Sequence, residues 1–132
     1  MLQAITNKIT KELKLAIGEN KVSDSKYTRI AYRLSHSTET LLFDPDDFTP
    51  GCVVWPERVE DIQTILTIAS EHEVPIVPVA GRTCSSDSEG IKGGIALDLS
   101  RMNQVIEFSE GTQRFTAESG ICVSECVAYL QK

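Results

Sequence analysis

The chain has 132 residues, of which 41% are hydrophobic and 24% charged, the composition of a soluble globular protein with one hydrophobic core. Its formal net charge of −6 argues against nucleic acid as a partner, because binding to a phosphate backbone needs a basic surface. No apolar run approaches the ~20 residues that span a bilayer, and the lysine-containing N-terminus does not read as a secretory signal. We therefore expect no transmembrane segment and a cytoplasmic location.

The first third of the chain predicts two helices followed by irregular structure. Apolar residues at helical spacing indicate a helix over residues 2–17, which Gly18 ends. A second, short amphipathic helix is expected within residues 23–34, with Ser23, Asp24 or Ser25 as its cap. Residues 35–50 are rich in Ser, Thr, Asp and Pro, and they predict an irregular segment that lies over the surface.

The remainder predicts short strands that alternate with helices. A strand over residues 52–55 is stopped by Pro56, and a helical stripe then runs from Val59 to Ala69, with acidic residues at its positive end. The further elements expected are strands over 76–79, 95–99, 105–108 and 114–117, a hairpin turn at 109–112 and a helix over 123–130. Strand, helix and strand in this order predict a parallel crossover, with ligands bound at the carboxyl ends of the strands.

No familiar catalytic or metal-binding motif stands out. The sequence has no G-x-G-x-x-G, no G-K-[ST] and no His-x-x-x-His. His36 and His72 are isolated, and His72 is expected to be either a solvated surface residue or a partner for a helix C-terminus. The cysteines form no C-x-x-C pair. Cys122 and Cys126 share a helix face and with a histidine could hold zinc, but we expect two buried structural thiols.

The loop after the strand at 76–79 is the best candidate for a binding site. Gly81 permits close approach of the backbone to a ligand, and small hydroxyl residues follow it at positions 83, 85 and 86. Successive amides in turn conformations form a concave anion site, and Arg82 could offset phosphate charge. The alternative is an ordinary polar surface loop, which the spacing alone favours. Asp87 and Glu89 support that alternative, because carboxylates repel a diphosphate.

Four blocks of the sequence, in order, carry a resemblance to a known family. They are PGCVVWPERVEDI at 50–62, VPIVPVAGRTC at 74–84, GGIALDLSRMN at 93–103 and ESG at 118–120. Together they resemble the FAD-binding domain of PCMH type, also called vanillyl-alcohol-oxidase-like, found in the glycolate oxidase and D-lactate dehydrogenase group. The match spans roughly residue 32 to the C-terminus.

The resemblance implies that the small-residue loop holds the FAD pyrophosphate through main-chain amides. The implied cofactor-binding residues are Val79, Ala80, Gly81, Arg82, Thr83, Cys84 and Ser85. Gly81 and Thr83 match the family directly, and Cys84 stands at its Ser, whereas Ala80 and Arg82 stand where glycine is usual. If either needs a left-handed backbone, its Cβ costs ~1–2 kcal/mol.

Other positions of the resemblance also carry implications. Arg58 replaces a serine that would cap the helix, a loss of about 1 kcal/mol. No histidine for covalent flavin attachment is present, which implies non-covalent FAD. The block at 98–103 is expected to be a structural strand end and turn rather than a ligand contact.

We therefore expect an α/β (α+β) fold, with a small mixed, partly parallel sheet flanked by helices. Residues 1–34 would form an N-terminal helical segment, and residues 35–132 a partial PCMH-type domain whose second half and cap domain lie outside this chain. The implied function is the FAD-binding portion of a flavin-dependent oxidoreductase acting on a small 2-hydroxy acid, with little turnover as an isolated chain. The alternative is a truncated, non-enzymatic homologue that self-associates or binds a partner. A split flavoprotein completed by a complementary polypeptide lies between the two.

Overall fold

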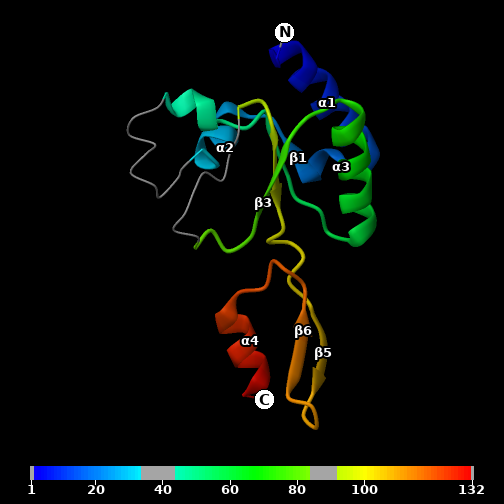
Figure 1. Cartoon of the computed structure of the whole chain (residues 1–132), viewed down its shortest axis with the longest axis vertical. Helices are drawn as coiled ribbons and strands as arrows, with labels where there is room; N and C mark the ends of the chain where they lie inside the picture. The colour runs from blue at the N-terminus through cyan, green and yellow to red at the C-terminus, as the bar shows by residue number, and fades with distance from the viewer. Residues whose placement is uncertain (1, 34–43, 84–91, 132) are drawn as a thin grey trace.

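The computed structural model describes residues 2–33, 44–83 and 92–131, which form two units arranged along the long axis of the molecule (Figure 1). The larger unit contains α1 (Leu2–Ile17), β1 (Val22–Ser23), α2 (Lys26–Ala31), β2 (Cys52–Val54), α3 (Val59–Glu71), β3 (Ile76–Val79) and β4 (Ile95–Asp98). The smaller unit contains β5 (Val105–Ser109), β6 (Arg114–Ala117) and α4 (Val123–Leu130). No helix in the described ranges is long and apolar enough to cross a membrane.

A four-stranded sheet organises the larger unit. Its strand order is β1-β2-β4-β3, with β4 parallel to both β2 and β3 and β1 antiparallel to β2. Ala96 of the central strand pairs with Val53 on one side and with Val77 on the other. Every residue of β2 and β4 is buried, which explains why both strands read as continuous apolar runs rather than as alternating ones.

Each face of this sheet carries its own core. On one face, α1 and α3 pack against β2 and β4, in a cluster that includes Ile9, Leu13, Ile65, Ile95 and Leu97. The other face has a smaller cluster of Tyr32, Val53, Val79 and Ala96, with Trp55 packed beside it. The alternation of Ile95, Ala96 and Leu97 between the two cores follows from the period of two of a strand.

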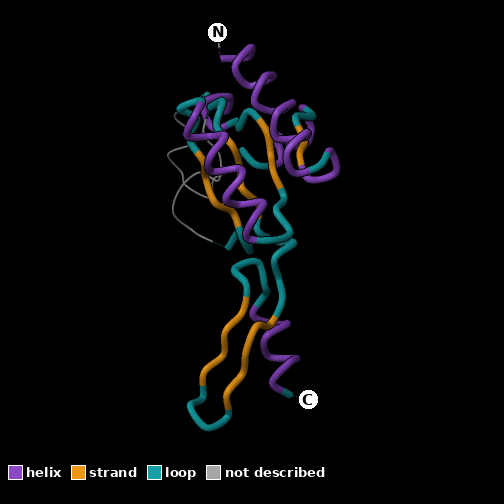
Figure 2. Tube along the Cα trace, turned by 90° about the vertical axis from the view of Figure 1, so that its right-hand side faces the viewer, coloured by secondary structure: helices purple, strands orange, loops and turns teal. Residues whose placement is uncertain are grey.

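The smaller unit is a hairpin with one helix beside it, extended away from the sheet (Figure 2). Strands β5 and β6 pair antiparallel, and the Phe115 ring lies 6.4 Å from the Phe108 ring and 5.9 Å from the Tyr129 ring. Where the hairpin joins the larger unit, buried Gly120 donates its N–H to the Met102 carbonyl at 2.9 Å. The aromatic contacts tie α4 to the hairpin, and the Gly120 contact ties the hairpin to the turn after β4.

The structure confirms the predicted α/β fold class with its mixed, partly parallel sheet. The clearest difference lies within residues 23–34, where the helix is limited to Lys26–Ala31 because the chain first pairs as β1, with Ser23 opposite Val53. Strands β2 and β3 are parallel as expected, but β4 lies between them. Of the predicted irregular segment, 35–43 lie outside the described residues, and Pro45–Phe48 form one 3₁₀ turn.

The structure corrects the prediction for two cysteines and decides between the two alternatives for His72. Cys122 is exposed and Cys126 half-buried, so the prediction of two buried thiols is wrong there, because a helix beside a single hairpin has no deep core. Among the described residues, no group of three His, Cys, Asp or Glu could hold a metal ion. His72 ends α3 and is not a solvated residue, since its ring Nε2 lies 2.8 Å from Glu12 of α1. His36 lies outside the described residues.

Candidate cofactor-binding edge of the sheet

The carboxyl ends of β2, β4 and β3 meet at one edge of the sheet, because the three strands run parallel. Trp55 follows β2, Asp98 ends β4, and the loop beginning at Ala80 follows β3. In open α/β sheets this edge is the usual place for a ligand. The geometry therefore brings the loop singled out from the sequence next to the ends of two buried strands.

The loop after β3 is anchored at its start and open beyond it. Val79 is buried, and its carbonyl accepts a hydrogen bond from the Leu99 N–H at 2.8 Å, so this residue belongs to the sheet. Ala80, Gly81, Arg82 and Thr83 are exposed, and a Cβ built on Gly81 would meet no atom within 4 Å. Residues 80–83 are thus accessible to a ligand, as a loop that holds an anion must be. Cys84 and Ser85 lie outside the described residues.

Arg82 has the left-handed backbone conformation that the family resemblance raised as a possibility at this position. Its φ is 54°, in the region where a Cβ costs ~1–2 kcal/mol. The guanidinium is engaged, because Nη2 donates to the carbonyl oxygen of Ala31 at 2.6 Å and the group lies 4.8 Å from the centre of the Tyr32 ring. These contacts hold the side chain against the end of α2 and the Tyr32 ring.

A buried polar cluster lies beneath the loop, and sequence reasoning missed two of its three members. The Tyr32 hydroxyl donates to Asp98 Oδ2, and the Trp55 indole N–H lies 3.2 Å from both of these oxygens. Burial, and then the Asp98 carboxylate, raise the pKa of Tyr32 to about 12. Asp98 also accepts the Ser100 N–H at 2.8 Å, as expected of a structural strand end. A carboxylate directly after a buried apolar run was the available signal that such partners were needed.

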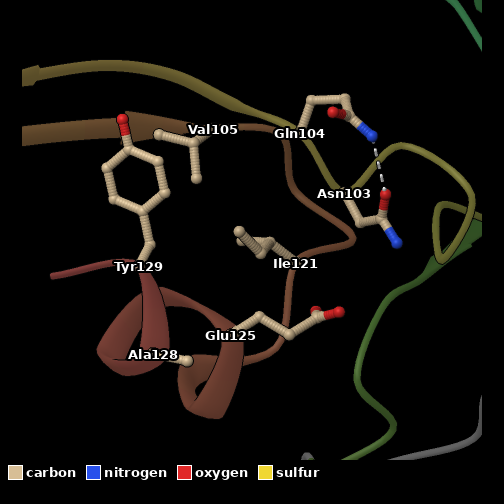
Figure 3. A pocket seen from close by; sticks show the side chains of 7 residues that line it. All are labelled: Asn103, Gln104, Val105, Ile121, Glu125, Ala128 and Tyr129. Atoms are coloured by element: carbon tan, nitrogen blue, oxygen red, sulfur yellow. Dashed lines mark hydrogen bonds between the residues drawn. The ribbon is translucent and has the colours of Figure 1, made fainter. Parts of the chain in front are cut away.

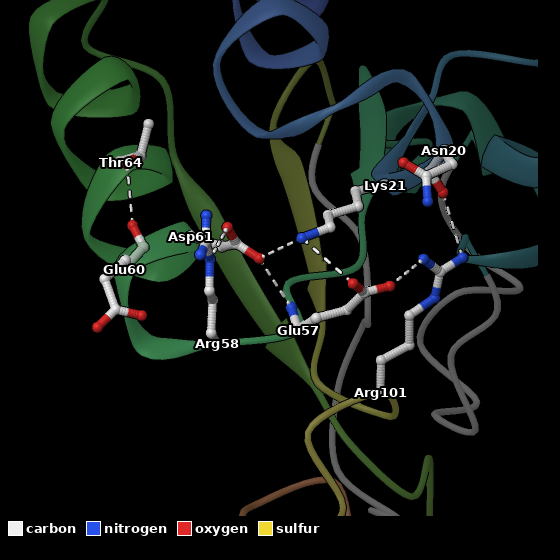
Figure 4. Close-up of polar contacts among 8 residues, drawn as sticks. All are labelled: Asn20, Lys21, Glu57, Arg58, Glu60, Asp61, Thr64 and Arg101. Atoms are coloured by element: carbon white, nitrogen blue, oxygen red, sulfur yellow. Dashed lines mark hydrogen bonds and ion pairs between the residues drawn. The ribbon is translucent and has the colours of Figure 1, made fainter.

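An ion-pair network joins the turn after α1, the start of α3 and the turn after β4 (Figure 4). Lys21 Nζ lies 2.7 Å from Asp61 Oδ2 and 3.3 Å from Glu57 Oε2, and Arg101 Nη1 lies 3.0 Å from Glu57 Oε1. The hydrogen bond to Asp61 raises the pKa of Lys21, and the bonds from Lys21 and Arg101 lower that of Glu57. Arg101 also lies 5.5 Å over the Trp55 ring, so the network borders the same edge of the sheet.

Asp61 makes the side-chain contacts at the start of α3, where a serine cap is missing. Arg58 is the N-cap residue, and its side chain makes no capping bond, in agreement with the loss expected from the sequence. Asp61 Oδ2 accepts a hydrogen bond from the Glu57 N–H at 3.0 Å, and Asp61 Oδ1 accepts one from Arg58 Nε at 3.2 Å. A carboxylate in the first turn also interacts favourably with the positive end of the helix. The carboxylate therefore holds the segment that leads into α3, whereas the side chain of Arg58 caps none of the first N–H groups of the helix.

A separate pocket of about 370 Å³ lies in the smaller unit, between α4 and the base of the hairpin (Figure 3). Its apolar lining comes from Val105, Ile121, Ala128 and Tyr129. Glu125 faces it, but Oε2 of this residue accepts the Cys122 N–H at 2.8 Å and so caps α4. The pocket lies away from the strand ends and brings no further acid or base to the loop after β3.

The fold and the position of the loop define an α/β domain with a candidate ligand site at the carboxyl ends of its parallel strands. Comparison with known proteins gives the particular family. Residues 50–132 match the family described as FAD binding domain. The chain belongs to this family, the FAD-binding domain of PCMH-type oxidoreductases, and the resemblance drawn from the four sequence blocks is confirmed.

Among curated relatives, the glycolate oxidase subunit GlcD of Bacillus subtilis is 29% identical over 129 residues, which is 93% of this chain and 25% of that protein. The D-2-hydroxyglutarate dehydrogenase of Stutzerimonas stutzeri is 30% identical, over 58% of this chain and 17% of that protein. The mitochondrial cytochrome-type D-lactate dehydrogenase of Arabidopsis thaliana is 33% identical, over 63% of this chain and 15% of that protein. The chain thus spans at most a quarter of the length of these relatives.

Solved structures show the same fold. A p-cresol methylhydroxylase with substrate bound superposes with a TM-score of 0.86 at 23% identity, covering 98% of this chain and 25% of that one. A 4-ethylphenol oxidase from Gulosibacter chungangensis superposes with a TM-score of 0.80 at 25% identity, covering 97% of this chain and 25% of that one. Both units of the chain are included in these superpositions, so the smaller unit belongs to the shared architecture.

Proposed function

We propose that this chain binds FAD non-covalently and that the loop from Val79 to Ser85 holds the pyrophosphate. The observation that carries the proposal is the exposure of Ala80, Gly81 and Thr83 at the carboxyl end of a parallel strand, in a chain of an FAD-binding family. Main-chain N–H groups suit a diphosphate because they bring positive partial charge without the bulk of a side chain. Val79 would act by fixing the start of the loop.

The chain would be the FAD-binding portion of an oxidoreductase acting on a small 2-hydroxy acid. Support for this substrate class comes from the relatives, whose names include glycolate oxidase, D-2-hydroxyglutarate dehydrogenase and D-lactate dehydrogenase. Bound FAD supplies hydride acceptance, while the protein contributes binding and orientation. The described residues 79–83 would serve the binding step, and the Tyr32–Asp98 cluster would support them from below.

The test is a titration of the purified chain with FAD, followed by co-elution of the flavin absorbance on a sizing column. Gly81→Asp should weaken binding by about tenfold or more, because it adds a carboxylate beside the diphosphate. Gly111→Asp is the matched control, since Gly111 lies in the hairpin turn with equally open space around it. Absence of flavin binding at tens of micromolar FAD, or equal affinity in the two variants, would contradict the proposal.

A second candidate function is self-association of a non-enzymatic module through the smaller unit. The observation that favours it is a set of exposed apolar side chains on β5 and α4, namely Ile106, Phe108, Val123, Val127, Tyr129 and Leu130. A single hairpin with one helix buries little apolar surface, and exposed apolar patches mark interaction sites. The proposed partner is a second copy of this chain.

Sedimentation velocity tests this candidate. The wild-type chain should sediment as a dimer, and Val127→Glu should sediment as a monomer, because a carboxylate would have to be desolvated in the interface. Leu15→Glu is the control, since Leu15 is equally apolar and 88% exposed but lies on α1. A wild-type chain that remains monomeric would exclude self-association.

A further inference from the structure

We infer that Arg82 is a positioning residue that sets the conformation of the cofactor loop by fastening it to α2 and to the Tyr32 ring. This inference rests on the proposed FAD binding and assigns the loop's shape to one side chain of this chain. Arg82 is exposed and has a left-handed backbone, so the loop itself provides no reason for an arginine there. The reason lies in what its guanidinium contacts.

The first anchor is the end of α2. Ala31 is the last residue of that helix, and carbonyls in a last turn have no partner within the helix. Nη2 of Arg82 donates to the Ala31 carbonyl oxygen at 2.6 Å across a sequence separation of 51 residues. The bond therefore ties the loop to the end of α2.

The second anchor is the Tyr32 ring, which is itself held in place. The guanidinium carbon lies 4.8 Å from the ring centre, within range of a cation–π contact. Tyr32 is 8% exposed, and its hydroxyl is bonded to Asp98 at the end of the central strand. Arg82 thus connects the loop, through Tyr32, to a rigid part of the core.

These two anchors explain how a residue other than glycine can hold the left-handed turn. Glycine would adopt this conformation freely, but it would adopt many others as well. Arginine at this position pays the steric penalty once, on folding, and its two contacts keep the loop in one conformation. A loop that is already ordered loses less entropy when it binds a ligand, so the clasp formed by Arg82, Ala31 and Tyr32 should raise affinity for the diphosphate.

The experiment compares FAD affinity in the full chain carrying Arg82→Ala, Arg82→Gly or the control Arg114→Ala. Arg114 is an exposed arginine on β6, so its removal changes net charge equally. We expect Arg82→Ala to weaken binding about five- to tenfold, Arg82→Gly to weaken it less because glycine accepts the positive φ, and Arg114→Ala to leave it unchanged.

The salt dependence of FAD affinity separates positioning from a direct phosphate contact. A guanidinium acting as a phosphate ligand would make binding weaken with salt, and Arg82→Ala would remove that dependence. If Arg82 acts only as a clasp, FAD affinity should fall equally with salt in the wild type and in Arg82→Ala, although the two affinities differ. Overturning results are an Arg82→Gly variant that binds as tightly as the wild type, or a salt dependence lost in Arg82→Ala.

A measurement without cofactor tests the clasp alone. Urea unfolding midpoints of Arg82→Ala, Tyr32→Leu and the double variant should be non-additive, because each single change removes the same contact. Tyr32→Phe replaces Tyr32→Leu if the latter fails to fold; it keeps the ring, so the full effect of Arg82→Ala should persist in its background. Additive midpoints with Leu, or loss of the Arg82→Ala effect with Phe, would overturn the inference. A wild-type chain that binds no FAD would instead overturn the proposed function, and the cycle would still decide the clasp.

Discussion

Gly120→Ala is expected to lower the free energy of unfolding by about 3 kcal/mol, because overpacking against fixed backbone is among the costliest small changes. A Cβ at this position would lie 1.8 Å from the Leu99 carbonyl oxygen and 2.8 Å from that of Met102. Neither atom is the end of a flexible side chain, so the backbone itself would have to move. Urea unfolding followed by circular dichroism measures the effect.

The matched control is Gly111→Ala in the turn of the hairpin. A Cβ there would meet no atom within 4 Å, so the midpoint of unfolding should change little. Because Gly120 lies where the two units join, amide exchange in β5, β6 and α4 should rise most in Gly120→Ala. An alanine variant as stable as the wild type would show that the close contact of Gly120 with the carbonyl groups of Leu99 and Met102 does not require a glycine.

Asp61→Asn should destabilise the fold by about 2 kcal/mol, because a buried charged acceptor is removed from beside a lysine. Asp61 is 3% exposed and joins Lys21, Arg58 and the Glu57 N–H at the start of α3. The amide keeps the shape of the carboxylate but not its charge. Thermal or urea unfolding at neutral pH checks the size of the effect, with Asp46→Asn as the control. Asp46 is 78% exposed and 3.8 Å from Arg33, so its loss should change stability very little.

The pH dependence of the Asp61 effect has a definite sign. Burial raises the pKa of Asp61, but the hydrogen bonds from Lys21, the Glu57 amide and Arg58 outweigh it, and the pKa lies below its ordinary value of 3.8. A depressed folded-state pKa means that the stabilisation is complete above the unfolded-state pKa and is lost as pH falls through the folded one. The difference between wild type and Asp61→Asn should therefore be constant near neutrality and shrink below about pH 4. A difference that grows on acidification would contradict this assignment.

The sequence predicted the features of this fold that depend on local burial. The apolar stripe of α3 and the uninterrupted apolar runs of β2 and β4 gave their elements directly, since helices and buried strands have distinct patterns. The same reasoning located the loop after β3. The family resemblance, in which Arg82 stands where glycine is usual, raised the possibility of a left-handed backbone there, which the structure shows. Patterning reports which residues are buried, and here it was sufficient for the fold class.

What the sequence did not predict are contacts between distant segments. The two-residue strand β1 is too short to show a period, so the sequence predicts a helix from residue 23 and not the pairing of β1 with β2. Tyr32 and Asp98 are separated by 66 residues, and no local pattern links them. The missing cap at Arg58 was visible, but the ion pair between Asp61 and Lys21 at the start of α3 depends on where the turn after α1 lies. Such partners are set by tertiary packing.

The place of β4 in the sheet has a consequence for how the chain is made. The strand at the centre of the parallel sheet is the last of the four to be synthesised, since β1, β2 and β3 all precede Ile95–Asp98 in the chain. Before β4 leaves the ribosome, β2 and β3 lack the strand that lies between them. The backbone groups on the edges that face β4 cannot yet be paired. The parallel part of the sheet should therefore assemble in one late step, and the nascent chain would be most exposed to aggregation just before that step.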